Sequence, residues 1–484
     1  MIGALVRLDL MLLARSRAAW LLVTLLLIAA ALALSSGLDW RERYLGAATT
    51  ARAQAAQSEQ VLVAVYGDIA TGRRQPTNVE TFDGNGEFIP DPRDPYVAGF
   101  YHIRIAELPA GPLLGLATGS TELRATHHLI RSVPLSSLMR VGQPAERVNP
   151  GALAAGRFDL LAFILYLCPL ALVFLLFDAT AREREAGISQ LLAGLGASRR
   201  ELLIARGITR GGLVSTVAIA ASIIGIMLLG ALGNAAAGWW ILATAAYLMM
   251  WTMLLLWVAS ISLSVVGSAA VAVAVWVALL LLSPGLVERA LRPAGLLEPR
   301  ALAEADVRKV IREVNADPAS LAAAKLKVAR EYWKIDFAKA PACADRKDVL
   351  KDYVERRLSD EAYTSAMRAG AAREAIYDIQ LDRWGWLSPV LAIRRTMEVV
   401  AGVDPARQRA FEEQVIDYHA TWRNRVTDAV FACRTFDRAA FDAAPKFEWR
   451  APDAGPTAWI GVLITAVLAL LAGILALRRR VLLS

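Results

Sequence analysis

The stretch FDLLAFILYLCPLALVFLLF, residues 158–177, carries a single charged side chain and decides the fold class. A hydrocarbon core about 30 Å thick, crossed at about 1.5 Å per residue, requires roughly 20 apolar residues. This stretch therefore predicts a transmembrane helix. Five further stretches are comparable in length and composition: residues 18–34, 212–232, 239–258, 261–282 and 458–477. Together they predict a mainly α protein built on a six-span transmembrane helical bundle.

The composition is typical of a membrane protein, with 56% hydrophobic and 20% charged residues among 484. The first apolar stretch could also belong to a signal peptide, because Arg7, Arg15 and Arg17 precede it. However, the stretch is long, and the following SSGLDW, residues 35–40, forms only a weak cleavage site. We therefore expect an uncleaved membrane anchor.

The basic residues indicate the orientation, because Lys and Arg near span ends stay on the cytoplasmic side. Six spans place both termini on one side. The start of the chain, residues 178–210 and the tail Arg478–Arg479–Arg480 then carry net charges of +2, +2 and +3, most of the formal +8. We expect both termini to be cytoplasmic. The pI near 9.5 then reflects topology and not nucleic-acid binding.

Tryptophans support the predicted boundaries, because indoles favour the headgroup layer of a membrane. Trp20 begins the first span and Trp459 begins the sixth, while Trp239 and Trp240 begin the fourth. Their shared placement favours these span ends.

Two polar segments interrupt the spans, and both fall on the outer side in this topology. Residues 38–157 open with helix formers at 41–60, so the first span is expected to continue outward as a long helix. Gly and Pro turns follow, which predict a mixed α/β or loop-rich extracytoplasmic domain. The remaining predicted segments are the cytoplasmic N-terminus with the first span (1–37), the second span (158–178) and the cytoplasmic coupling loop (179–210). The third to fifth spans (211–284) and the sixth span with its basic tail (457–484) complete the chain.

The second outer segment, residues 285–456, is expected to be mostly helical. Apolar residues recur at helical spacing among charged ones in residues 301–314, 318–332, 345–367 and 405–425. We expect these amphipathic helices to pack on one another. Cys343 and Cys433 both lie in this segment, and a disulfide between them would suit an oxidising compartment, whereas Cys168 lies within a span.

The predicted cytoplasmic loop, DATAREREAGISQLLAGLGASRRELL at residues 178–203, holds the candidate functional residues. On a helix, Ile188, Leu191, Leu192 and Leu195 share one face. We expect a short helix at the inner membrane surface, with its apolar face toward the bundle and its charged end toward a soluble protein.

Residues 183–206 resemble the loop of ABC-2-type permeases, in which an acidic and basic cluster precedes Gly, paired leucines and Ser-Arg. Ile188 stands where Thr is usual, and Arg206 where Lys is common. In that superfamily the element couples the permease to its ATPase. The resemblance implies an ATPase-coupling role for these residues: Arg182, Glu183, Arg184, Glu185, Gly187, Ile188, Leu191, Leu192, Ser198 and Arg199.

A second resemblance covers most of the chain. The phrases DPRDPY (91–96), PAGPL (109–113), GSTEL (119–123), LSP (387–389) and AGVD (401–404) look like a bacterial subgroup of these permeases with large extracytoplasmic domains of unassigned function. It implies a multi-pass inner-membrane protein that dimerises, with itself or with a sister permease, and binds two ABC ATPase subunits.

The chain itself is not expected to hydrolyse ATP. A phosphate-binding loop needs a Gly-rich backbone followed by Lys and Ser or Thr, yet the first lysine is Lys309 and no such pattern follows it. The resemblance implies that ATP and Mg are bound by the partner ATPase. We expect no catalytic, cofactor-binding or metal site here, and His102, His127, His128 and His419 are interpreted as packing or surface residues.

The spans contain few charges, apart from Asp159 and Asp178 near the ends of the second span. This argues against an ion-coupled secondary carrier, which places ionisable groups deep in the bundle. An apolar patch at Trp384, Trp386 and Leu387 could lie on the outer leaflet or be buried in the outer domain. Both interpretations stay open from the sequence.

The sequence therefore predicts the permease subunit of an ATP-driven ABC exporter. It would contact membrane lipid and an ATPase subunit, but not nucleic acid. The alternative hypothesis is a non-transporting membrane scaffold, or mechanotransmitting subunit, whose outer domains bind periplasmic partners. The sequence does not identify a cargo.

Overall fold

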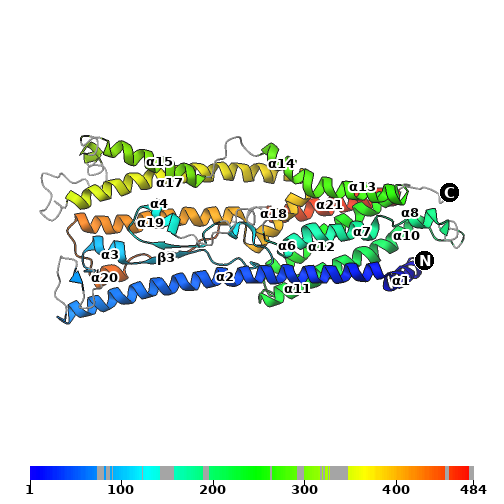
Figure 1. Ribbon diagram of the computed structural model, residues 1–484, viewed down its shortest axis with the longest axis horizontal. Helices are drawn as coiled ribbons and strands as arrows, with labels where there is room; N and C mark the ends of the chain where they lie inside the picture. Colours follow the sequence, from blue (N-terminus) through cyan, green and yellow to red (C-terminus); the bar gives the residue numbers. More distant parts are fainter. Residues whose placement is uncertain are drawn as a thin grey trace.

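The computed structural model of the protein describes residues 1–73, 81–82, 88–89, 91–122, 124–141, 157–188, 194, 196–261, 264–291, 299–316, 319, 322–324, 326–327, 347–452 and 457–478. Figure 1 shows an elongated molecule, with α1 and the end of α21 at one extremity, which we call the basal end. Apolar helices fill the basal half. We call the opposite half the distal domain; it comprises residues 41–73, 91–141, 299–316, 347–384 and 405–452.

Six described helices are long and apolar enough to cross a membrane, as the sequence predicts: Arg17–Ala70, Leu160–Glu185, Arg199–Leu228, Ala235–Ser260, Val265–Leu291 and Trp459–Arg478. Three of them contain a π-helical turn. The second span consists of α6 (Leu160–Ala162), η2 (Phe163–Leu167), α7 (Cys168–Leu176) and α8 (Ala181–Glu185). The third consists of α10 (Arg199–Arg206), η3 (Gly207–Gly211) and α11 (Gly212–Leu228). The fifth consists of α13 (Val265–Val277), η4 (Ala278–Leu282) and α14 (Ser283–Leu291). The protein is a multi-pass, mainly α membrane protein.

The fourth span, α12 (Ala235–Ser260), lies at the centre of the bundle. The Asn234 side chain caps its first turn by accepting a hydrogen bond from the Ala236 amide at 2.9 Å. The hydroxyl of the buried Tyr247 donates to the Leu165 carbonyl at 2.9 Å, so α12 is fixed against the second span. Trp240 is also buried and donates to the Ser222 hydroxyl, so this tryptophan is not a headgroup anchor, whereas Trp239 is exposed.

The first span and its outward extension form one helix, α2 (Arg17–Ala70), which follows a shorter α1 (Ile2–Arg15). Its 54 residues correspond to a length of about 80 Å, and Figure 1 shows it running from the bundle into the distal domain. Gly37 permits the Gly115 backbone to approach α2, because an added Cβ would overlap the Gly115 carbonyl. The predicted extension of the first span is confirmed.

The first outer segment contains short elements around a small antiparallel pairing, in line with the sequence. Strand β3 (Arg104–Glu107) pairs with β4 (His127–Ile130) and aligns Arg104 with Ile130. The other described elements are β1 (Thr81–Phe82), β2 (Phe88–Ile89), α3 (Pro95–Tyr101), η1 (Gly119–Glu122) and α4 (Leu135–Val141). Antiparallel β1 and β2 form a second pair.

The second outer segment is helical, with α15 (Pro299–Asn315), α17 (Lys347–Trp384), η7 (Gly385–Leu387), α18 (Pro389–Ala401), α19 (Pro405–Phe431) and α20 (Arg438–Asp442). The predictions at 301–314, 345–367 and 405–425 are confirmed, and α17 is longer than predicted. Most of the predicted helix at 318–332 lies outside the described residues. Phe411, Trp422 and Phe436 are buried together, and form the distal core with α3 and β3.

Helix α18 joins the two halves of the molecule. Its buried Ile393 and Met397 belong to the same apolar core as the membrane bundle. The Gly461 amide of α21 (Thr457–Arg478) donates to the Thr396 hydroxyl of α18 at 3.2 Å. Just before α18, Trp384 and the neighbouring apolar patch are exposed, which favours the membrane-surface interpretation over burial.

Candidate functional site

A cluster of buried charges lies at the basal end, where Figure 1 places α1, α8 and α10 together. We call it the basal ion cluster; it consists of Asp9, Asp178, Glu183, Arg206 and Arg210. Asp9 is only 4% exposed and Arg206 only 3%. Charges buried to this extent are stable only when they are paired and hydrogen-bonded.

Asp9 of α1 receives contacts from the start of the third span. Arg210 donates to its carboxylate from Nε at 3.3 Å and from Nη2 at 3.1 Å, and the Thr209 hydroxyl also donates to it. Arg206 Nε lies 3.7 Å from Asp9 Oδ1. The carboxylate therefore holds α1 against the third span.

The same arginines also hold the basal end of the second span. Arg206 forms a two-pronged pair with Glu183, with Nη1 donating to Oε2 at 2.8 Å. Arg210 donates from Nη1 to Asp178 Oδ1 at 3.2 Å and to the Leu175 carbonyl at 2.7 Å. The guanidinium groups of Arg206 and Arg210 therefore connect three parts of the chain: α1, the basal end of the second span and the start of the third span.

Local sequence brings these arginines into position. The π-helical η3 begins directly after Arg206 and contains Arg210, next to the glycines that allow α12 to approach closely. A Cβ on Gly211 would lie 2.6 Å from Thr252 Cγ2, and one on Gly207 would lie 2.8 Å from Leu256 Cδ1. Larger residues at these two positions would push α12 away from η3.

The predicted loop is also attached to the end of α12 and the start of α13. Arg199 Nη2 donates to the Ser260 carbonyl at 3.0 Å, and Glu185 accepts from the Val265 amide at 2.8 Å. Ser198 forms a capping box with Glu201 at the start of α10. These predicted residues therefore have structural contacts within the chain.

The structure modifies the predicted orientation of the loop. Glu183 and Glu185 were expected to face a soluble protein, yet both contact other parts of the chain, because Arg206 and the α13 amide lie close enough to pair with them. Ile188 was expected to pack toward the bundle but is 48% exposed. Arg182 pairs with Asp178 at 2.8 Å and remains exposed. Leu191 and Leu192 lie outside the described residues.

The other predicted residues have simpler placements. Arg184 is half-buried in α8. Gly187 adopts a left-handed backbone with φ of 71° and has open space around its Cα, so it suits the turn that ends α8. Cys433 is exposed just after α19, while Cys343 lies outside the described residues. Their pairing therefore stays a prediction.

Sequence reasoning missed Asp9, Thr209 and Arg210 as site residues. The available signal was an aspartate in the apolar α1, together with two arginines four residues apart at the start of a span. Ionisable residues within such helices often mark functional positions. Arg206 was noted only as a departure from the family pattern.

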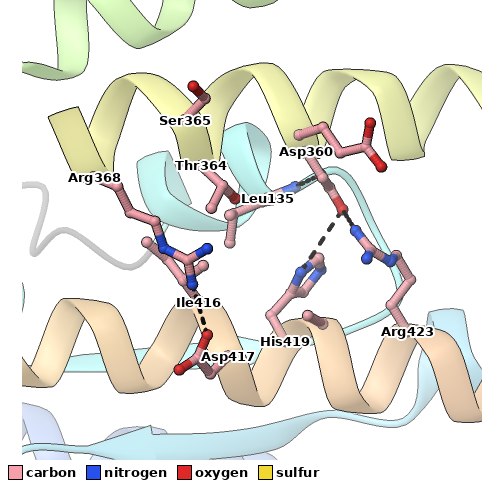
Figure 2. Close-up of a pocket in the computed structure, with 11 residues that line it drawn as sticks. Leu135, Asp360, Thr364, Ser365, Arg368, Ile416, Asp417, His419 and Arg423 are labelled. Carbon is pink, nitrogen blue, oxygen red and sulfur yellow. Dashed lines mark hydrogen bonds and ion pairs between the residues drawn. The ribbon is translucent and has the colours of Figure 1, made fainter.

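A second polar site lies in the distal domain, in a cavity of about 520 Å³ between α17 and α19 (Figure 2). Asp360 is 2% exposed; its carboxylate accepts from the Leu135 amide at 2.7 Å and from Arg423 Nη1. His419 points toward Asp360, with Nδ1 3.8 Å from Oδ2, and its Nε2 lies 2.9 Å from the Val133 carbonyl. The interpretation of His419 as a packing residue is consistent with its burial.

His102 makes the stability of the distal domain dependent on pH. Its ring centroid lies 4.3 Å from that of Phe441, and burial lowers its pKa from 6.5 to about 3. Below pH 6.5 the unfolded chain gains a proton that folded His102 does not take up, so stability falls as the pH drops. Between pH 7 and 5 we expect a loss of about 2 kcal/mol from this residue.

Thermal unfolding of the full chain, followed at both pH values, measures this effect. The variant His102→Phe keeps an aromatic ring but cannot be protonated, and should show a smaller difference between the two pH values. An unchanged difference in the variant would contradict the assignment. Burial also lowers the pKa of His419, so some acid sensitivity should remain.

Two family models match this chain. The one described as "ABC-2 family transporter protein" matches residues 4–317, well over half of the sequence, and includes the basal ion cluster and five spans. The one described as "Domain of unknown function (DUF3526)" matches residues 327–450. No curated protein and no solved structure matches the chain. The protein therefore belongs to the ABC-2 transporter family, as a membrane transport subunit with an additional C-terminal domain.

Proposed function

We propose that the chain is the permease subunit of an ATP-driven exporter, and that a separate ABC ATPase docks on the loop at residues 182–200. The observation that carries this proposal is the basal ion cluster behind the loop. It connects α1, α8 and the third span through buried pairs, while Arg182, Ile188 and Arg200 are exposed. Exposed side chains on a segment that buried ion pairs hold in place are suited to bind a partner protein.

The ion pairs of the basal ion cluster suggest how the partner would act on the spans. Movement of α8 would displace Arg206 through Glu183, and therefore the start of the third span. The same segment contacts the start of α13 through Glu185. Partner movement would thus reach several spans together. ATP and Mg would be bound by the ATPase, and the permease would form a homodimer or pair with a sister permease.

The variant Ile188→Asp is expected to weaken ATPase binding about tenfold or more, because an exposed apolar contact at an interface is replaced by a charge. Co-purification and ATPase stimulation measure the effect. Stability should change by less than about 0.5 kcal/mol, since the side chain is exposed. The matched control is Leu286→Asp, also exposed but at the far end of the fifth span. Equal ATPase binding by both variants and the parent chain would contradict the docking site.

We also propose that the protein lies in a bacterial inner membrane with both termini in the cytoplasm. The positive charge at the basal end supports this orientation. A cytoplasmic reporter fused at Gly187 or at the C-terminus should be active, whereas the same reporter within residues 405–431 should be inactive. Opposite signals from the first two fusions would exclude the topology.

A second candidate function is a membrane scaffold or mechanotransmitting subunit whose distal domain binds periplasmic partners. The uninterrupted α2 and the shared core at α18 favour it, because they would carry bundle movement outward. ATPase activity stimulated by a cargo in liposomes, with accumulation of that cargo, would support export. Normal ATPase coupling without transport of any tested amphiphile would favour the scaffold.

A further inference from the structure

An apolar groove opens between the third, fourth and sixth spans in the basal half of the bundle. Its volume is about 360 Å³, and its lining extends from Leu203 to Ile219 along the third span and from Gly473 to Leu477 along the sixth. Thr252 and Leu256 of α12 are buried beneath it. Ile208 and Met249 are lining residues that remain more than half exposed, so the groove opens at the bundle surface.

Missing side chains create this space. Gly207 and Gly211 pack against α12, but a Cβ added to Gly212 would meet no atom within 4 Å. The part of the third span that lines the groove covers about 24 Å at 1.5 Å per residue. This exceeds half of a hydrocarbon core of about 30 Å. The groove is therefore long enough for a lipid acyl chain from the basal leaflet.

Positive charge lies at the basal end of two groove walls. Arg200 is exposed one helical turn before Ile204, and the exposed Arg478 directly follows Leu477. Arginines at this level attract anionic headgroups. A symmetric contact with a second copy through this face would instead bring these like charges together, which disfavours it.

We propose that the groove binds one acyl chain of an anionic phospholipid, whose phosphate is held by Arg200 and Arg478. The lipid would contact the face of η3 that includes Gly207 and Gly211, next to the segment that carries the basal ion cluster. The proposal concerns lipid of the basal leaflet and does not depend on the ATPase partner.

Native mass spectrometry of the full chain in detergent tests the groove, with phosphatidylglycerol and phosphatidylcholine of identical acyl chains as probes. Gly212→Leu should fill the groove and reduce binding of the first phosphatidylglycerol at least tenfold. Gly238→Leu is the matched control, because this exposed glycine of α12 also has open space but lies outside the groove. Equal loss in both variants, or in neither, would overturn the proposal. The proposal would also be overturned if Gly212→Leu converted a dimer into monomers but still bound the first phosphatidylglycerol.

The headgroup contact is tested by Arg200→Gln and Arg478→Gln. Each should reduce the preference for phosphatidylglycerol over phosphatidylcholine about fivefold. Arg17→Gln, an exposed arginine at the basal end of the first span, should leave the preference unchanged. A photoreactive phosphatidylglycerol with its label in the acyl chain should react within residues 203–219 or 473–477. Uniform labelling of all spans, or an equal effect of all three substitutions, would overturn the site.

Discussion

Replacing Asp9 with alanine is expected to destabilise the basal half of the bundle by about 3–5 kcal/mol and to uncouple the partner ATPase. The buried carboxylate accepts from Thr209 and Arg210 and lies beside Arg206, so its loss leaves buried donors without their acceptor. Breaking a buried ion pair on one side has a cost of this size, because a charge remains uncompensated. Thermal unfolding in detergent and ATPase stimulation in liposomes measure the two effects.

The matched control is Leu8→Ala, the neighbouring residue on α1, which is 44% exposed. Its effect on stability should be small. A double-mutant cycle of Asp9→Ala with Thr209→Val should show coupling, because the two side chains share a hydrogen bond. If Asp9→Ala unfolds like the parent chain, the basal ion cluster does not hold α1 against the third span.

The sequence predicts the membrane architecture well, because the number of consecutive apolar residues is set by bilayer thickness. It also predicts the outward extension of α2, since residues 41–60 are rich in good helix formers and contain no proline. The π-helical turns were not predicted. They lie within continuous apolar stretches or at a span end, and one of them, η3, carries Arg210 of the basal ion cluster.

The candidate site was only partly predictable. The charged loop was found because its residues lie together in the sequence. Asp9 and Thr209 are separated by 200 residues, so no local pattern indicates their contact. The inward orientation of Glu183 has the same origin, since its partner Arg206 lies 23 residues away in α10. Glu183, interpreted as partner-facing, instead pairs with the buried Arg206, whereas Arg182 of the same loop is exposed.

The two polar sites lie at opposite ends of one connected scaffold. Helix α2 passes from the bundle to the distal domain, and Tyr44 on this helix donates to the Leu108 carbonyl at 2.6 Å. Arg52, farther along, pairs with Glu107 of β3. The distal strands are therefore attached directly to the extension of the first span. Such a connection requires the distal domain to follow movement of that helix.

Asp360→Ala is expected to destabilise the distal domain by about 3–5 kcal/mol while leaving the membrane bundle folded. The substitution removes the acceptor of the Leu135 amide and leaves the buried Arg423 without its carboxylate. Both Leu135 and Arg423 are buried, and each then loses a hydrogen-bond partner. Hydrogen exchange should become faster across α17 and α19, the two helices that Asp360 and Arg423 join.

Ser365→Ala provides the comparison, because this exposed side chain lines the same cavity without belonging to the buried pair. Its exchange pattern should match that of the parent chain. The Asp360→Asn variant keeps the shape and one carbonyl oxygen, so its loss of stability should fall between the other two. Equal protection in all three would mean that the Asp360–Arg423 pair is not needed to hold α17 and α19 together. Faster exchange limited to α17 and α19 would instead show that the Asp360–Arg423 pair joins them, and that the distal domain can open while α2 and the bundle remain intact.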